Sequence, residues 1–126
     1  MNNFVITIRK PYTKRILKRT KKFEIRTRIP KDLEKGDKIY VVEAGTHGGI
    51  FFYFIVRSII KINPWDAWLQ YGHKDLGVSL EDFYQYTKNS KFIYLIEIGI
   101  IDSTYGCFNI RDMNIKRPPM WFTRVK

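Results

Sequence analysis

The stretch Lys21–Ala44, KKFEIRTRIPKDLEKGDKIYVVEA, decides how this chain folds, because it holds two strand patterns separated by a turn. Its first part alternates, so Phe23 and Ile25 should point to one face of a strand while Glu24 and Arg26 point to the other. A loop containing proline and glycine then leads to a second, mostly apolar run, KIYVVE. The stretch therefore predicts two strands, and the first carries an acid and several bases on one face.

The charged face of the first strand has two possible roles. Glu24 lies between Lys22 and Arg26 on that face. Such a row is either a surface charge ladder or the floor of a binding site, and surface ladders are the more common case. The strand alone therefore favours a structural role, and the rest of the chain must decide whether a site is present.

Length and composition predict one folded domain over residues 1–126. A chain of 126 residues with 44% hydrophobic residues can bury a core without metal or disulfide staples. The single cysteine, Cys107, cannot form an internal disulfide and is expected to be a small core residue. The first residues show no leader-like segment, and no apolar run is long enough to cross a membrane. We therefore expect an intracellular, cytoplasmic protein without membrane attachment.

Positive charge is concentrated in two parts of the chain. Residues 1–38 hold 13 Lys and Arg against 4 Asp and Glu, a net +9. Residues 39–110 hold 5 against 7, a net −2, and residues 111–126 hold 5 against 1, a net +4. An even scatter would indicate only a basic surface, whereas this distribution indicates a directed field. The partner that it predicts is a polyanion, with nucleic acid as the first candidate.

The remaining pattern predicts about six strands and two to three short helices. The apolar run 50–62 is expected to be a central strand, Asn63 and Pro64 to start a helix, and Ser79 to start another. Trp65, Trp68 and Leu69 form a stripe at helical spacing, which favours a core position over a base-stacking surface. The other expectations are strands at 3–9, 20–28, 38–43, 91–101 and 121–125, a helix at 11–18 and a loop at 71–77. This order is typical of an α+β, mainly β fold with a partly closed barrel.

The first helix is expected to be amphipathic and strongly basic on its outer face. Pro11 fits the first turn of a helix, and Tyr12, Ile16 and Leu17 should face inward. The outward side chains are then Lys14, Arg15, Lys18 and Arg19. Clustered cations repel each other, so this face is favourable mainly opposite an anionic partner.

No metal or cofactor site is expected. His47 and His73 are isolated, and no second histidine or cysteine lies at ligand spacing from either. The sequence also contains no phosphate-binding loop with a Gly-Lys-Ser/Thr ending and no serine-hydrolase elbow.

Three segments in the right order resemble the ASCH family of the PUA-like superfamily, in its branch of transcriptional-regulator-like proteins. The first matches the family pattern G-x-K-x-x-E-x-R followed by G-D, through Lys21, Glu24, Arg26, Gly36 and Asp37. The second resembles the mid-chain helix of the family and runs over GVSLEDF at 77–83 with a tyrosine at 86, and the third is the RPP ending at 117–119 with aromatic residues after it.

Two positions differ from the family pattern. Arg19 replaces the signature glycine, so the turn before the strand must form with a side chain present. Trp121 replaces the polar residue that often follows the two prolines. The fold that the resemblance implies is a PUA-like pseudobarrel.

The resemblance implies a regulatory module that binds RNA or a nucleotide in a basic cleft between the first helix and the barrel. Lys21 and Arg26 have the chemistry to bind phosphate, and Glu24 can accept hydrogen bonds from the amine of a base. Tyr12 and Trp121 are candidates for base stacking. The expected ligand-binding residues are Tyr12, Lys14, Arg15, Lys18, Arg19, Lys21, Glu24, Arg26 and Trp121.

Two alternatives remain. Some ASCH-like proteins hydrolyse N-acylated cytidine with a lysine, a threonine and a glutamate, and others are ribonucleases. Lys21 matches that lysine, but Glu24 occupies the threonine position, so the hydroxyl nucleophile is missing and a non-catalytic role is favoured. If the protein is an enzyme, Lys21 and Glu24 are the catalytic candidates. Thr20 and Asp75 are the nearest substitutes for the missing hydroxyl and acid. A protein-interaction module with an exposed aromatic patch around residues 65–68 is the third possibility.

Overall fold

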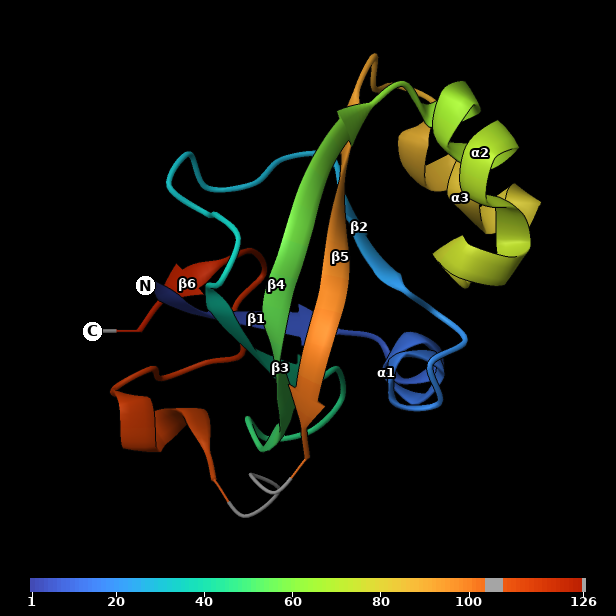
Figure 1. Ribbon diagram of the computed structural model, residues 1–126. Coiled ribbons are helices and arrows are strands. Elements are labelled where there is room, and N and C mark those ends of the chain that lie inside the picture. Colours follow the sequence, from blue (N-terminus) through green and yellow to red (C-terminus); the bar gives the residue numbers. More distant parts are fainter. Residues whose placement is uncertain (104–107, 126) are drawn as a thin grey trace.

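The computed structural model describes residues 1–103 and 108–125 (Figure 1). Within this part of the chain, three α-helices accompany a sheet of six strands. The elements are, in order, β1 (Asn3–Ile8), α1 (Lys10–Leu17), β2 (Phe23–Arg26), β3 (Lys38–Glu43), β4 (Ile50–Ile62), α2 (Pro64–Leu76), α3 (Leu80–Thr87), β5 (Ile93–Asp102), the short 3₁₀ helix η1 (Ile110–Met113) and β6 (Thr123–Arg124).

The sheet is curled into a half-barrel with strand order β2-β5-β4-β3-β1-β6 (Figure 1). β1 runs parallel to β3, and the other neighbouring strands are antiparallel. β4 is an interior strand between β5 and β3, as its continuous apolar run predicted. The predicted fold class, α+β and mainly β with a barrel-like sheet, is therefore confirmed.

Two hydrophobic clusters fix the position of β2, the edge strand of the half-barrel that lies next to a pair of helices. One cluster fills the curl of the sheet and includes Phe4 of β1 and Phe52 of β4, with Ile16 of α1 packed against them. The other joins Phe23 and Ile25 of β2 to residues of α2 and α3, among them Leu76 and Phe83. In Figure 1, α2 and α3 accordingly lie at one end of the long β4–β5 pair and α1 lies below the lower end of β2. β2 thus borders both α1 and the α2–α3 pair.

Local capping signals set the helix ends. The Asn63 side chain accepts hydrogen bonds from the backbone of Trp65 and Asp66 at the start of α2, and Ser79 accepts one from Asp82 at the start of α3. Both starts were predicted. Before β3, the buried carboxylate of Asp37 accepts hydrogen bonds from backbone N–H groups of residues 2 and 34, which fixes the Gly36–Asp37 turn.

The predicted loop at 71–77 is wrong, because α2 continues to Leu76. Gly72 adopts φ 63° and ψ −173°, a conformation that breaks the helix without ending it. Helical geometry then resumes, and Gly77, with a left-handed φ of 67°, is the C-cap residue of the helix. Gly72 therefore marks a kink, and the helix ends at Leu76, four residues later.

The predicted core stripe on α2 is wrong for two of its three residues. Trp65 is 62% exposed and Leu69 is 65% exposed. Trp68 alone packs inward, with its ring centroid 5.4 Å from that of Phe83. The buried residues of α2 are Ala67 and Leu76, so the apolar spacing at 65, 68 and 69 did not identify the face that the tertiary structure buries.

Other expectations differ by smaller amounts. The charged strand expected at 20–28 is shorter, since only Phe23–Arg26 pairs with β5. The first helix begins and ends one residue earlier than expected. Cys107 lies outside the described residues, so its expected core position stays a prediction. In the described part of the chain, no helix is long and apolar enough to span a membrane.

Candidate functional site: a charged cavity between α1, β2 and α3

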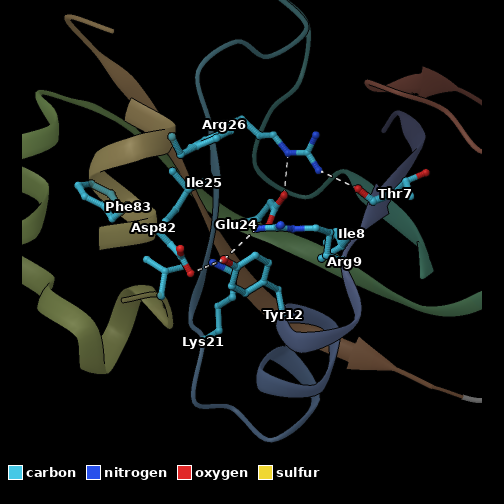
Figure 2. Close-up of a pocket in the computed structure, with 12 residues that line it drawn as sticks. Thr7, Ile8, Arg9, Tyr12, Lys21, Glu24, Ile25, Arg26, Asp82 and Phe83 are labelled. Carbon is cyan, nitrogen blue, oxygen red and sulfur yellow. Dashed lines mark hydrogen bonds and ion pairs between the residues drawn. The ribbon is translucent and has the colours of Figure 1, made fainter. Parts of the chain in front are cut away.

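A cavity of about 420 Å³ lies where β1, α1, β2 and α3 meet. Figure 2 shows the charged strand β2 along one wall, Tyr12 of α1 beside it, and Asp82 and Phe83 of α3 opposite. The volume is typical of small-molecule sites, which range from about 300 to 1,000 Å³. The charged and hydroxyl-bearing side chains on its wall are Thr7, Arg9, Tyr12, Lys21, Glu24, Arg26, Asp82 and Tyr86.

Lys21 is a buried lysine on the wall of this cavity. It is 2% exposed, and its Nζ donates a hydrogen bond to the Leu76 carbonyl at 2.9 Å. Burial lowers the pKa of Lys21 from its ordinary value of 10.5 to about 8. The Glu24 carboxylate raises this pKa in part, whereas the guanidinium groups of Arg15 and Arg26 lower it further. Lys21 is therefore charged at neutral pH but close to titration.

Gly77 provides the space in which the Lys21 side chain lies. A Cβ at position 77 would be only 2.4 Å from Lys21 Cβ and 2.7 Å from its Cγ. The left-handed φ of 67° at the end of α2 also favours glycine. Arg15 donates to the Gly77 carbonyl at 2.8 Å, so α1, β2 and the end of α2 meet at this residue. We call Lys21, Gly77 and Arg15 the lysine wall.

Glu24 and Arg26 form a nearly buried ion pair on β2. Arg26 Nε donates to Glu24 Oε2 at 2.7 Å, and the two side chains are only 14% and 8% exposed. The Arg26 guanidinium also donates to the Thr7 carbonyl at 3.3 Å and lies 5.5 Å from the centroid of the Phe122 ring. Both side chains nevertheless reach the cavity wall, so the pair serves as part of an open site as well as a structural contact (Figure 2).

Tyr12 connects the cations on either side of it. Its hydroxyl accepts a hydrogen bond from Arg9 at 3.2 Å and lies 3.5 Å from the Asp82 carboxylate. The same ring lies within 5.1 Å of the Arg9 guanidinium, 5.5 Å of Arg15 and 5.4 Å of Lys21 Nζ. Such distances favour cation–π attraction and hold the ring in place. One aromatic side chain therefore contacts cations of the cavity and of the lysine wall.

The structure brings only part of the predicted site together. Tyr12, Lys21, Glu24 and Arg26 line the cavity. Their role as ligand-binding residues stays a prediction. The other residues of the predicted set lie elsewhere.

Those other residues lie in three places. Lys14 on α1 and Lys18 just after it are exposed, and Arg15 and Arg19 line a separate hollow on the other side of the lysine wall. Trp121 packs against the core of the half-barrel and donates to the Arg28 carbonyl, outside the cavity lining. Arg19 has a left-handed φ of 61°, so an arginine makes the turn for which the family pattern has glycine.

The substitutes considered for a hydrolase do not reach the cavity. The Thr20 hydroxyl donates to the Arg15 carbonyl, and Thr20 lines the outer hollow. Asp75 is 3.1 Å from Lys22 Nζ in a partly exposed ion pair. Thr7 is the threonine on the cavity wall, and in the described part of the chain its buried Oγ1 has no hydrogen-bond partner.

Sequence reasoning missed Arg9, Asp82 and Tyr86 as cavity residues and Gly77 as the support of Lys21. Arg9 is the N-cap residue of α1. From this position its long side chain reaches the cavity. Asp82 and Tyr86 are four apart on one face of α3, a spacing that could have indicated a shared surface. Among the described residues, no group of three or more His, Cys, Asp or Glu could hold a metal ion.

The half-barrel sheet with its short helices defines the fold class of this protein, and comparisons with known proteins identify its family. The family model described as "ASCH domain" matches residues 6–104. This chain belongs to the ASCH family. No curated protein matches the chain.

Similar solved structures come from the ASCH protein of Zymomonas mobilis. Two single-residue variants match with TM-scores of 0.85 and 0.84, and the protein itself with 0.81, each at 16% identity. The matches cover 98–100% of this chain and 87–91% of the Zymomonas chains. At this identity the likeness establishes the fold.

Proposed function

We propose that the cavity binds a nucleotide and that the protein is a regulatory, non-catalytic module for RNA or nucleotides. The observation that carries this proposal is the convergence of Arg9, Lys21 and Arg26 on one cavity of nucleotide size. Arginine binds phosphate through paired donors and lysine binds it as a point charge. We further propose that residues 1–126 form a single domain of the PUA-like superfamily. In this proposal the protein acts in the cytoplasm.

The inner part of the cavity suits a base. Glu24 Oε2 is bonded to Arg26, and within the described residues no donor reaches its other oxygen, Oε1. That oxygen is available to accept a hydrogen bond from an amine, as acidic side chains do with the N4 amine of cytosine. Tyr12, Phe83 and Tyr86 add aromatic surface to the lining of the same cavity. A cytosine or adenine base is therefore favoured over uracil.

Isothermal titration with CMP and UMP tests this assignment. We expect CMP to bind about tenfold more tightly than UMP, and Glu24→Gln to remove most of that difference, because a side-chain amide also offers a donor to the uracil carbonyl. Lys21→Met keeps the buried shape but lacks the charge, so it should weaken both nucleotides by about tenfold or more. Lys116→Gln, an exposed change away from the cavity, is the control. If neither nucleotide binds, or if Lys21→Met binds both normally, the proposal is wrong.

A second candidate function, hydrolysis of a modified nucleoside or of RNA, is favoured by the pKa of about 8 at Lys21. A lysine close to titration beside Glu24 has the properties of a general acid or base. The hydroxyl nucleophile of the hydrolase pattern is absent at position 24, so this function ranks second. Incubation with N4-acetylcytidine and a small RNA panel decides it. Product formation that disappears in Lys21→Met and Glu24→Gln would replace the binding role with a catalytic one.

A further inference from the structure

A second hollow lies on the outer side of the lysine wall. Arg15, Arg19 and Lys22 line it together with His73 and Lys74 from the end of α2. The cations Arg15, Arg19, Lys22 and Lys74 come from α1, from the turn before β2 and from α2, and they line one hollow. Lys22 has an ion-pair partner in Asp75, but its side chain is still 56% exposed. Like charges gathered at this density repel one another unless an anion covers them.

Arg19 extends this surface toward the sheet. Its guanidinium donates to the Gly99 carbonyl at 2.8 Å and lines a neighbouring hollow with Lys35 and Arg57. In the described part of the chain, neither hollow has an Asp or Glu in its lining. We call the cations of the two hollows, Arg15, Arg19, Lys22, Lys35, Arg57 and Lys74, the outer basic track.

Residues of the first helix and of the turn after it link the track to the cavity. Tyr12 lines the cavity, Arg15 lines the outer hollow, and Arg19, in the turn after the helix, lines both outer hollows. The Tyr12 ring contacts the guanidinium groups of both Arg9 and Arg15. A single row of side chains therefore runs from the cavity, past the lysine wall, to the outer hollows.

We propose that the natural ligand is an RNA strand, with one nucleotide in the cavity and its neighbouring phosphates along the outer basic track. This inference rests on the function proposed above and specifies its ligand as a polymer. A free nucleotide engages the cavity alone and leaves the track uncovered. A flexible single strand has unstacked bases to offer to a cavity and a charged backbone that follows a curved surface.

The polymer should differ from the mononucleotide in its salt dependence. Binding of single strands weakens with salt by a slope of about 0.7 in log K per neutralised phosphate. If four cations of the track contact phosphates, the slope for an RNA octamer should exceed that for CMP by roughly three. Mononucleotide binding should be nearly insensitive to substitutions at track residues other than Arg15, because none of them lines the cavity or contacts Tyr12.

A binding experiment with octacytidylate and CMP, at several salt concentrations, tests the proposal. The key variant is Arg19→Gly with Lys74→Gln. Glycine adopts the left-handed backbone of position 19 without strain, and Lys74 is exposed on α2, so the variant should fold. The control, Lys31→Gln with Lys116→Gln, loses the same charge at exposed positions outside both hollows. Thermal unfolding of each variant checks the fold.

We expect the octamer to bind at least about tenfold more tightly than CMP at low salt. The track variant should weaken the octamer about tenfold more than the control does, reduce its salt slope by about 1.4, and leave CMP affinity unchanged. The proposal is overturned if the octamer binds no more tightly than CMP while CMP still binds. It is also overturned if track and control variants behave alike, or if polyglutamate displaces the octamer as well as octacytidylate does. If neither RNA nor CMP binds, the nucleotide function itself fails.

Discussion

The cavity and the outer basic track lie on opposite sides of one wall, yet they hold positive charge in different ways. In the cavity wall, Lys21 is buried and hydrogen-bonded to the Leu76 carbonyl, and Arg26 is mostly buried and paired with Glu24. Lys74 and Arg19 of the track are exposed to solvent. A buried charge costs stability and has one orientation, whereas an exposed charge costs little and is screened by salt. The cavity is therefore suited to selecting a ligand, and the track to attracting one.

The largest expected effect is on the lysine wall that separates the two regions. Gly77→Ala puts a Cβ 2.4 Å from Lys21 Cβ at a left-handed position. Overpacking and backbone strain together should lower the free energy of unfolding by about 2–4 kcal/mol, measured by urea denaturation. Gly45→Ala is the matched control, because it has a φ of 89° and no atom within 4 Å of the added Cβ. An equal loss in both variants would show that Lys21 does not depend on Gly77 for its position.

A pH series measures the cost of burying Lys21. The folded pKa of about 8 lies below the ordinary 10.5, so the unfolded chain binds more protons between these values. Stability contributed by this residue therefore rises as pH increases from about 8 to 10.5. The free energy of unfolding of the natural protein, relative to that of Lys21→Met, should increase by about 3 kcal/mol over this range. A constant difference would mean that Lys21 is well solvated.

The same titration should weaken ligand binding. Only the protonated form of Lys21 attracts phosphate, and at about pH 9 roughly one molecule in ten would carry that proton. We expect the affinity for CMP to fall about tenfold between pH 7 and pH 9, and Lys21→Met to show almost no fall. An effect of the same size in Lys21→Met would assign the pH dependence to another group.

The smallest expected effect concerns Tyr12, which contacts both regions. Tyr12→Phe keeps the ring between Arg9 and Arg15 but removes a hydroxyl that is 3.5 Å from Asp82. CMP and octacytidylate affinities should each change by less than about threefold, since a weak, exposed hydrogen bond contributes little. Tyr12→Ala removes the ring and should weaken both ligands more. A large effect of Tyr12→Phe alone would assign the hydroxyl a direct ligand contact.

Features that depend on neighbouring residues in the sequence were predictable. Asn63 and Ser79 cap their helices through bonds to residues two or three positions away, and the alternating pattern placed Glu24 and Arg26 together on β2. The cavity opposite them was less accessible to prediction. Asp82 comes from a helix nearly sixty residues later in the chain, and nothing near β2 in the sequence shows that α3 packs there.

The side of the helix on which each cation lies was also unpredictable. Arg15 and Arg19 are directed to the outer hollow by the carbonyls of Gly77 and Gly99, which belong to α2 and β5. Likewise, Trp65 and Trp68 have equivalent helical spacing, but only Trp68 meets Phe83 of α3. In each case the deciding contact comes from a distant part of the chain.

An NMR titration of the uniformly ¹⁵N-labelled protein with CMP tests most directly whether the cavity is a nucleotide site. Saturable shifts should appear in the backbone amides around Tyr12, Lys21–Arg26 and Asp82–Tyr86, with little change at Lys35 and Arg57 of the track. Absent shifts in the cavity, or saturable shifts confined to residues outside it, would contradict a nucleotide site between α1, β2 and α3.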